Sequence, residues 1–414
     1  MAGAGSDFEV VVIGGGAAGV AAARRLHEAS IRCLIVEARP RLGGRAWTVT
    51  DQSGFGLDLG CGWLHSADRN PWVAVAQQHG ATIDKTPPPW MRPAIELGFP
   101  RAEQAEFGQA MGAFFARLEA AGQGGPDTPG AAFFDPASRW NGLINAVSTY
   151  ISGAEWDRVS VRDFDRYDDN GINWRIVEGF GTTIAAYAAN VPAMLDCEVR
   201  GIDHSGKRLC IETRKGVILA DQVIVTVSSA ILASERIRFA PALPAKIEAA
   251  AGLPLGLADK LFMSLEGAEE FEKDVRLFAH TDRAGTGGYH FRPFGRPLIE
   301  AYFGGQQARE LEADGERAFF DFAVSELTGV LGSNFAKRIK PLRIHCWGED
   351  PFALGSYSYA KPGFADCRAM LAEPVDDRLF FAGEACSRHD FSTAHGGWHT
   401  GVATAERVVA ARRQ

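Results

Sequence analysis

The sequence predicts an α/β protein with two lobes, one built on a parallel sheet and the other a mixed α+β structure. Two observations lead to this prediction. Near the N-terminus a strand pattern, a glycine turn, a helical pattern and a second strand pattern follow one another within residues 8–36, and such a βαβ unit places its strands in parallel. Further along, strand and helix patterns alternate in blocks, so each lobe is expected to combine separate segments of the chain.

The first lobe is expected to begin with the N-terminal βαβ unit. Its apolar run, glycine turn, helix-forming run and second apolar run lie at Phe8–Ile13, Gly14–Gly16, Ala17–Ala29 and Arg32–Val36. Strand patterns of the same lobe return at Val199–Ile211, Val217–Ala220 and Gln222–Val227. Near the C-terminus, the strand pattern Arg378–Ala382 is followed by glycines and by the helical pattern Val402–Arg413.

The second lobe is expected to fill the intervening segments. Its helix and strand patterns lie at Gln104–Ala121, Trp140–Ile151, Asp259–Leu265, Pro297–Phe303 and Glu316–Gly329. We therefore expect the first lobe to comprise residues 1–72, 176–235 and 346–414, and the second lobe to comprise residues 73–175 and 236–345. A chain of 414 residues is long enough to give each lobe its own core.

Composition and charge exclude several classes of protein. With 46% hydrophobic and 23% charged residues, the chain has the composition of a soluble globular protein. Its net charge of −8, without a basic cluster, argues against nucleic acid or an anionic membrane as a partner. No stretch reaches the ~18 apolar residues of a membrane span, and the N-terminus lacks the pattern of a signal peptide. The seven cysteines are scattered without metal-ligand spacing, which predicts no metal site and a reducing, cytoplasmic location.

Three glycines follow the first strand in the pattern G-x-G-x-x-G, at Gly14, Gly16 and Gly19. Between a strand and a helix they permit a tight turn, let a pyrophosphate approach the backbone and let the helix pack closely on the sheet. Glu37 ends the second strand, where a carboxylate accepts hydrogen bonds from an adenosine ribose. The glycine pair Gly43-Gly44, followed by Arg45, offers further donors to the same pyrophosphate and favours FAD over NAD.

Several segments carry a resemblance to a known family. They are VVVIGGGAAGVAAARRL and VEARPRLGGR near the N-terminus, LDLGCGWLH at 57–65, LFFAGEA at 379–385 and HGGWHTG at 395–401. Together they resemble the flavin-containing amine oxidase family, which includes monoamine and polyamine oxidases and histone lysine demethylases. The resemblance implies a Rossmann-like FAD-binding domain interleaved with a substrate-binding domain.

The resemblance also implies where FAD binds: the glycine motifs and Arg45 at the pyrophosphate, Glu37 at the ribose, and Gly62 near the flavin ring. The expected cofactor-binding residues are Gly14, Gly16, Ala18, Gly19, Glu37, Ala38, Arg39, Gly43, Gly44, Arg45, Gly60, Gly62, Trp63, Val199, Trp347, Gly383, Glu384 and Thr393. For Val199 an ordinary core position is an equal alternative. Ser356 stands where some members attach FAD through a cysteine, so FAD is expected to bind non-covalently.

On the substrate side, Lys260 matches the family lysine that holds a water against flavin N5, with a solvent-facing strand lysine as the alternative. Tyr357, which follows Trp347 in the chain, matches one aromatic wall of the amine-binding cage. The second wall falls at Thr393, which has no ring. Trp398, a nearby histidine or a tryptophan of the second lobe is expected to replace it. The expected catalytic residues are Lys260, Tyr357 and Trp398.

These features predict an FAD-dependent amine oxidase. A hydride passes from the amine α-carbon to flavin N5, the imine hydrolyses, and O2 reoxidises the flavin and yields H2O2. The expected partners are a small amine and O2, and a homodimer is compatible with the sequence. The missing cage ring leaves open a desaturase or porphyrinogen-type oxidase of the same superfamily. A flavin-bearing binding protein with little turnover is a further alternative.

Overall fold

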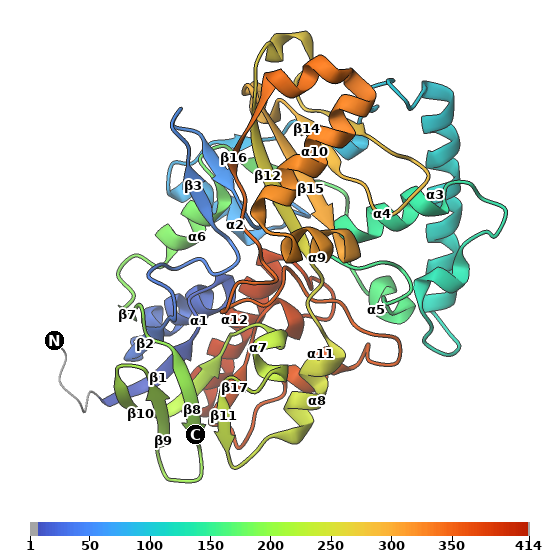
Figure 1. Cartoon of the computed structure of the whole chain (residues 1–414). Coiled ribbons are helices and arrows are strands. Elements are labelled where there is room, and N and C mark those ends of the chain that lie inside the picture. The colour runs from blue at the N-terminus through green and yellow to red at the C-terminus, as the bar shows by residue number, and fades with distance from the viewer. Residues whose placement is uncertain (1–6, 413–414) are drawn as a thin grey trace.

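The computed structural model describes residues 7–412. An eight-stranded sheet occupies the lower half of the molecule in Figure 1, and a five-stranded sheet occupies the upper half. Segments from both ends of the chain lie together in the lower half. The predicted α/β class, with a largely parallel sheet in one lobe and a mixed α+β second lobe, is confirmed.

The strands of the eight-stranded sheet come from three distant parts of the chain. In spatial order they are β11 (Arg238–Ala240), β8 (Val199–Asp203), β9 (Leu209–Thr213), β10 (Gly216–Val225), β1 (Asp7–Ile13), β2 (Cys33–Val36) and β7 (Ala193–Met194), with β17 (Leu379–Phe381) also paired to β10. Strand β10 changes partner along its length, because Gly216–Ala220 pair antiparallel with β9 and Val223–Val225 pair parallel with β17. The sequence predicted two separate strands where this single strand runs.

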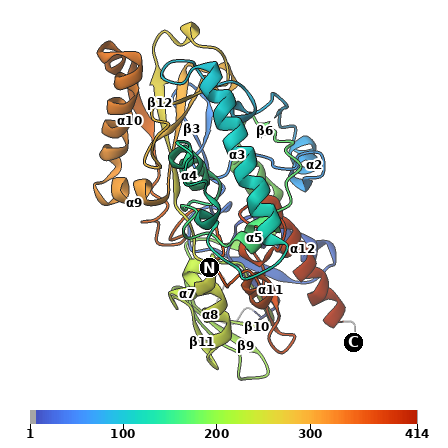
Figure 2. The same ribbon diagram turned by 90° about the vertical axis from the view of Figure 1, so that its right-hand side faces the viewer.

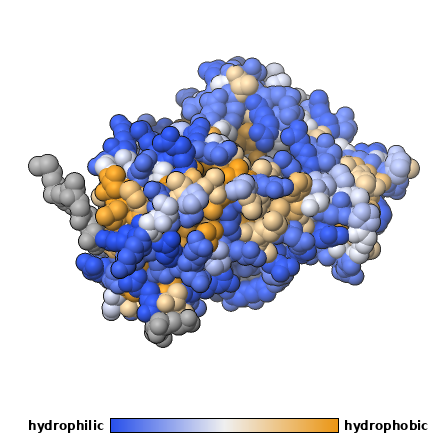
Figure 3. Space-filling view, turned by 90° about the horizontal axis from the view of Figure 1, so that it is seen from below, coloured by the Kyte–Doolittle hydropathy of each residue, from blue (hydrophilic) through white to orange (hydrophobic). Residues whose placement is uncertain are grey.

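Helices cover both faces of the eight-stranded sheet, which explains the uninterrupted apolar runs of its central strands. One face carries α1 (Ala17–Glu28) and α12 (Ala394–Ala411). The other face carries α7 (Ser229–Ala233), α8 (Pro244–Gly252) and α11 (Cys367–Ala372). Strand β11 belongs to this sheet, although it follows the expected lobe boundary at residue 235 in the sequence. Seen from below, the surface is mainly hydrophilic with a central band of apolar residues (Figure 3).

The glycine turn after β1 holds α1 against the sheet. A Cβ added to Gly19 would lie 1.9 Å from the carbonyl oxygen of Gly14, so only hydrogen fits at this position. Gly14 itself has a φ of +102°, which disfavours any other residue. The third glycine of the motif therefore serves helix packing, as the sequence predicted.

Replacing Gly19 with Ala is expected to disrupt this turn, because the added Cβ would lie 1.9 Å from Gly14 O and 3.0 Å from Gly14 C, and these backbone atoms cannot rotate away. We expect the purified variant to retain less than about a tenth of the wild-type FAD and to unfold at a lower temperature. Gly112→Ala is the matched control, since a Cβ there meets nothing within 4 Å and the change should stabilise helix α3 (Arg101–Gly122) by up to about 1 kcal/mol. Wild-type FAD content in Gly19→Ala would contradict the packing argument.

The C-terminal helix begins earlier than predicted. The sequence placed its start at Val402 and read Gly396 and Gly397 as a turn, but α12 begins at Ala394 and contains both glycines. A Cβ on Gly401 would lie 2.2 Å from the carbonyl oxygen of Ala18, and one on Gly397 would lie 3.4 Å from Ala17 Cβ. These glycines let α12 pack against the start of α1, a tertiary reason that a local pattern does not reveal.

The five-stranded sheet has the order β13 (Val275–Phe278), β14 (Gly288–Phe291), β15 (Leu298–Gly304), β12 (Ala258–Leu265) and β16 (Ile339–Arg343), all antiparallel. One face packs on α9 (Gly305–Ala313) and α10 (Glu316–Leu331) through residues such as Leu261 and Phe303. Because side chains alternate along a strand, Lys260, Glu300 and Tyr302 project from the opposite face. That face turns toward the first lobe and the helices described next.

The remaining elements surround the space between the two sheets. They are β3 (Thr48–Thr50), β4 (Gly56–Asp58), α2 (Pro71–Gln78), β5 (Ile83–Asp84), α3 (Arg101–Gly122), α4 (Asn141–Ile151), α5 (Val161–Asp165), β6 (Arg175–Ile176) and α6 (Phe180–Tyr187). Figure 2 shows α3 running along the side of the molecule, with α4 beside the five-stranded sheet. The predicted helices at 104–121, 140–151 and 316–329 are thus confirmed, each with bounds that differ by three residues or fewer.

Candidate active site

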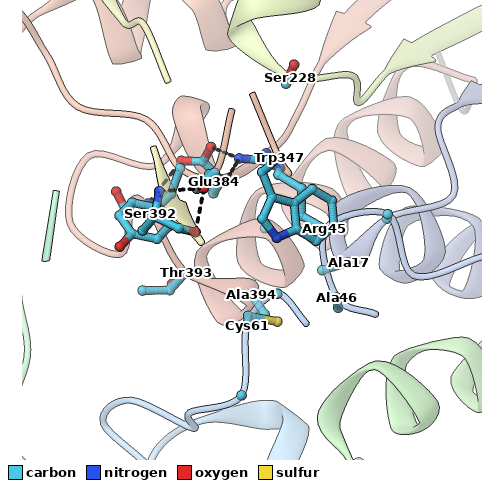
Figure 4. Close-up of a pocket in the computed structure, with 18 of the residues that line it drawn as sticks. Ala17, Arg45, Ala46, Cys61, Ser228, Trp347, Glu384, Ser392, Thr393 and Ala394 are labelled. Carbon is cyan, nitrogen blue, oxygen red and sulfur yellow. Dashed lines mark hydrogen bonds and ion pairs between the residues drawn. The ribbon is translucent and has the colours of Figure 1, made fainter. Parts of the chain in front are cut away.

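A cavity of about 660 Å³ extends from the glycine turn of the first lobe to the inward face of the five-stranded sheet. All the residues expected to bind cofactor line it except Gly19, which packs beneath the turn. Of the three expected catalytic residues, Lys260 and Tyr357 line the cavity. Figure 4 shows part of the wall, where Arg45, Trp347 and Glu384 lie close together.

The two glycine motifs meet at the start of α1. Gly43 N donates to Gly15 O over 2.8 Å, and a Cβ on Gly44 would lie 3.1 Å from Gly16 Cα. The N-cap of α1 is Gly16, which provides no side-chain acceptor for the first amides of the helix. Free amides at a helix N-terminus, next to backbone that lacks side chains, form a site suited to a pyrophosphate.

Glu37 stands at the end of β2 beside this anion site. Its Oε2 accepts a hydrogen bond from Gly15 N over 2.6 Å, and its Oε1 accepts one from Arg39 N over 2.8 Å. The Arg39 guanidinium forms two 2.7 Å hydrogen bonds to the carboxylate of Asp350. Burial opposes the charge of Asp350, but His345 and Arg39 outweigh burial and hold the pKa of this carboxyl below its usual value.

Arg45 and Glu384 form the centre of the wall in Figure 4. Arg45 Nη1 lies 2.9 Å from Glu384 Oε1 and donates over 2.7 Å to the carbonyl of Ser356. Glu384 Oε2 accepts from Ser358 Oγ over 2.6 Å and from Ser392 N over 3.0 Å. Burial disfavours the charged carboxylate, yet Arg45 and Ser358 outweigh it and keep the pKa of Glu384 below its usual value.

Lys260 forms a buried ion pair on the inward face of the five-stranded sheet. Its Nζ lies 3.0 Å from Glu300 Oε1 and donates over 3.1 Å to the carbonyl of Asp58. A Cβ on Gly62 would lie 3.2 Å from Lys260 Nζ, so the missing side chain leaves the ammonium open toward the loop expected beside the flavin. Burial disfavours the charged form of both side chains. The negative charge of Glu300 nevertheless helps to raise the pKa of Lys260 above its usual value, and the positive charge of Lys260 lowers the pKa of Glu300 below its usual value. The site therefore holds an ammonium.

A chain of charged groups continues from Glu300. His290 Nδ1 lies 3.6 Å from Glu300 Oε2, and its Nε2 lies 3.1 Å from Asp274 Oδ1. Arg175 Nη2 lies 2.8 Å from the same Asp274 oxygen. The sequence analysis missed all four residues of this chain. For His290 and Glu300 the signal was the alternating pattern of the strands, which places every second residue on one face, whereas Asp274 and Arg175 lie outside these strands and carried no such signal.

Aromatic side chains line the part of the cavity beyond Lys260. The Tyr357 hydroxyl donates over 2.5 Å to the carbonyl of Tyr150, which fixes the ring expected to form one cage wall. Tyr302 also lines the cavity, with the Lys260 ammonium 5.1 Å from its ring centre. Trp63 and Trp90 meet edge to face with their centres 4.4 Å apart.

Thr393 lies in the cavity wall, whereas Trp398 packs among helices outside it. Thr393 lines the cavity and caps α12, since its hydroxyl accepts from Gly396 N over 3.0 Å and donates to Asp390 O over 2.6 Å. Phe391, two residues earlier, also lines the cavity and supplies a ring where the sequence analysis found none. Trp398 packs with residues of α1, α2 and α6, outside the cavity lining of the described chain. The indole therefore lies among these helices and not in the cavity wall, and a catalytic role for Trp398 stays a prediction.

Comparison with known proteins adds to this geometry. The sequence matches the family described as flavin containing amine oxidoreductase over residues 17–107 and 133–409. The chain belongs to this family. Membership implies a flavin cofactor.

The relatives that match this chain include proteins named as histone demethylases and proteins named as polyamine oxidases. A lysine-specific histone demethylase 1 homologue of Oryza sativa is 29% identical and is matched over 98% of this chain, but over 52% of its own length. Polyamine oxidase 2 of Arabidopsis thaliana is 28% identical, with 96% of this chain and 87% of the relative covered. The chain thus spans about half the length of the demethylase relative and most of the polyamine oxidase.

Solved structures share the fold of this amine oxidoreductase. Wild-type putrescine oxidase bound to putrescine has a TM-score of 0.77, with 98% of this chain and 99% of that chain covered. A redesigned double mutant of putrescine oxidase has a TM-score of 0.78. At 16% identity this likeness shows the fold alone.

The described residues fit a flavin dinucleotide. The uncapped start of α1, the paired glycines and the Glu37 carboxylate suit a pyrophosphate and a ribose, and the cavity continues from there to Lys260. Within residues 7–412, no group of three or more histidine, cysteine or acidic side chains is placed to hold a metal ion. In the same part of the chain, no helix has the length and apolar character needed to cross a membrane.

Proposed function

We propose that this chain is an FAD-dependent amine oxidase that binds FAD non-covalently and uses O2 as its electron acceptor. The observation that carries the proposal is the buried Lys260 ammonium, which faces the Gly62 loop in a cavity continuous with the dinucleotide turn. When bound, FAD takes a hydride from the carbon beside the amine nitrogen and passes the electrons to O2, which yields H2O2.

The protein's own residues position the reactants and exclude water. The rings of Tyr357, Tyr302 and Phe391 line the cavity that also contains Lys260, and aromatic faces can orient an amine while they exclude water. The Lys260 ammonium places positive charge and a donor where electron density rises on reduction. A neutral amine needs no general base, and the imine product hydrolyses in water.

Non-covalent attachment is supported at Ser356. Its hydroxyl accepts from Ala258 N and donates to Ala258 O, both over 2.9 Å, so this side chain ties the 356–359 segment to β12. A hydroxyl in this position offers no thiol for a flavin thioether. The residues proposed to hold FAD are those of the sequence analysis that line the cavity, with Gly19 acting through helix packing.

The division into lobes is also a proposal. The FAD-binding lobe combines the three segments expected from the sequence, enlarged to include β11, and the substrate-binding lobe contains the five-stranded sheet with α3 and α4. The cytoplasmic location and a homodimer stay predictions.

A panel of primary, secondary and tertiary amines tests the proposed function. Mixed anaerobically with the yellow holoprotein, at least one amine is expected to bleach the flavin absorbance, and air is expected to restore it with one H2O2 per amine oxidised. Bleaching only by an apolar substrate without an amine would instead support a desaturase or porphyrinogen-type oxidase. A flavin that no compound reduces would leave only a binding role.

A further inference from the structure

Arg276 stands out among the residues that line the cavity, because its charge has no partner. It lies on β13, and its Nε is buried without a hydrogen-bond acceptor. Within residues 7–412, its guanidinium forms no hydrogen bond and no ion pair, and its ring contact is with Phe278, 4.8 Å from the guanidinium carbon. The other cations around this face are neutralised, Lys260 by Glu300 and Arg175 by Asp274.

The register of the sheet places Arg276 on the inward face. Arg276 pairs with His290, and His290 pairs with Glu300, so the three form one row across β13, β14 and β15. The next row contains Phe278, Tyr302 and Lys260. Between the strands that carry Arg276 and Lys260 there are three strand spacings of about 4.8 Å, roughly 14 Å in all. The two cations therefore mark opposite ends of one aromatic space.

An unpaired, half-buried cation in a cavity wall is costly to retain, and a ligand of opposite charge would neutralise it. Burial lowers the pKa of Arg276 to about 10, which still leaves the side chain charged at neutral pH. A guanidinium presents a planar fork of donors that matches a carboxylate in particular. The rings of Phe107, Phe115 and Tyr150, which also line the cavity, suit an apolar body between the two ends of a ligand.

We propose that Arg276 binds a carboxylate on the substrate, so that the physiological amine is an apolar amino acid whose carboxylate lies several bonds away from the reacting amine. This proposal deepens the proposed function and rests on it for the identity of the reaction. The separation of Lys260 from Arg276 disfavours substrates that carry both groups on one carbon. It also disfavours diamines, whose distal ammonium would meet a cation.

Ligand binding tests the anion site without any turnover. The probes are 4-propylbenzoate and its neutral amide, titrated into the oxidised holoprotein by calorimetry and by the shift of the flavin spectrum. The wild type is expected to bind the carboxylate at least about tenfold more tightly than the amide, as charge-assisted hydrogen bonds predict. Equal affinity for the two probes in the wild type would overturn the proposal.

Variants assign the preference to Arg276. Arg276→Met is expected to abolish the preference for carboxylate, and Arg276→Lys is expected to retain part of it, because an ammonium keeps the charge and loses the fork. Arg101→Met is the matched control, since Arg101 is exposed and paired with Glu96 on the surface. The assignment would be overturned if folded, flavin-loaded Arg276→Met kept the full preference for the carboxylate probe. It would also be overturned if Arg101→Met lost that preference.

Turnover separates this proposal from the proposed function. For 4-(2-aminoethyl)benzoate and 2-phenylethylamine, we expect kcat/KM to favour the carboxylate at least about tenfold in the wild type and not in Arg276→Met. Oxidation of both amines at equal kcat/KM would leave the oxidase standing and overturn the carboxylate site. Preferential binding of 4-propylbenzoate without oxidation of any amine would support the site and overturn the oxidase.

Discussion

Replacing Lys260 with Met is expected to slow the reoxidation of reduced flavin by O2 at least about a hundredfold, the usual effect of removing one preorganised donor or charge beside a reacting group. In the structure this ammonium is held between Glu300 and the carbonyl of Asp58, open toward Gly62. Stopped-flow mixing of anaerobically reduced enzyme with O2 measures the rate. Reduction by amine is expected to slow as well, and wild-type rates for both half-reactions would show that Lys260 has another role.

This substitution also removes the partner of a buried carboxylate, so its effect on stability needs a control. With Lys260 gone, Glu300 keeps His290 and the Tyr302 hydroxyl as its partners within residues 7–412, and an unpaired buried charge typically costs about 3–5 kcal/mol. The double variant Lys260→Met with Glu300→Gln removes both charges and keeps the volume. We expect it to recover most of the lost thermal stability and none of the lost reoxidation rate.

Replacing Arg368 with Met is expected to destabilise the protein by about 3–5 kcal/mol, the cost of breaking a fully buried ion pair. Arg368 on α11 binds both carboxylate oxygens of Asp163 on α5, over 2.6 and 2.7 Å, and both side chains are 1% exposed. It also donates over 2.9 Å to Ser358 Oγ, which in turn donates to Glu384 beside Arg45. The midpoint of thermal unfolding checks the prediction, and FAD content is expected to fall with it.

Two further variants show whether the pair accounts for this loss. Arg368→Met with Asp163→Asn removes the second charge but keeps an acceptor for Ala360 N, which Asp163 binds over 3.1 Å, so it should recover part of the midpoint. Arg317→Met breaks an exposed i,i+4 pair with Asp321 and should cost less than about 0.5 kcal/mol. Equal losses in Arg368→Met and Arg317→Met would contradict the account.

The sequence was sufficient to predict features that depend on local patterns. The βαβ unit, its three glycines and Glu37 lie within one short segment, and their spacing alone fixes a dinucleotide turn. The helix at 316–331 could likewise be predicted, because its helical pattern lies within one continuous segment of the sequence. Gly43 and Gly44 lie beside Gly16 in the structure, as expected of residues that approach one pyrophosphate.

Features that depend on register or on packing at a distance could not be predicted. The inward face of Lys260, Glu300, His290 and Arg276 exists only because four strands pair with one alignment, and a shift by one residue would turn these side chains to the other face. The start of the helix that carries Trp398 was misplaced for a related reason. The glycines near it seemed to mark a turn, and only their contacts with α1 show that they belong inside a helix.

The exchange of partners along β10 has a consequence for the order in which the protein can be built during translation. Strand β17 and helix α12 complete the lobe that begins with β1, yet nearly the whole chain is synthesised between them. Until residues 379–411 leave the ribosome, the second half of β10 pairs with β1 on one side only, and α1 lacks the helix that covers it. The nascent first lobe therefore has an open sheet edge until residues 379–411 are made, a state prone to aggregation that the pairing of β17 ends.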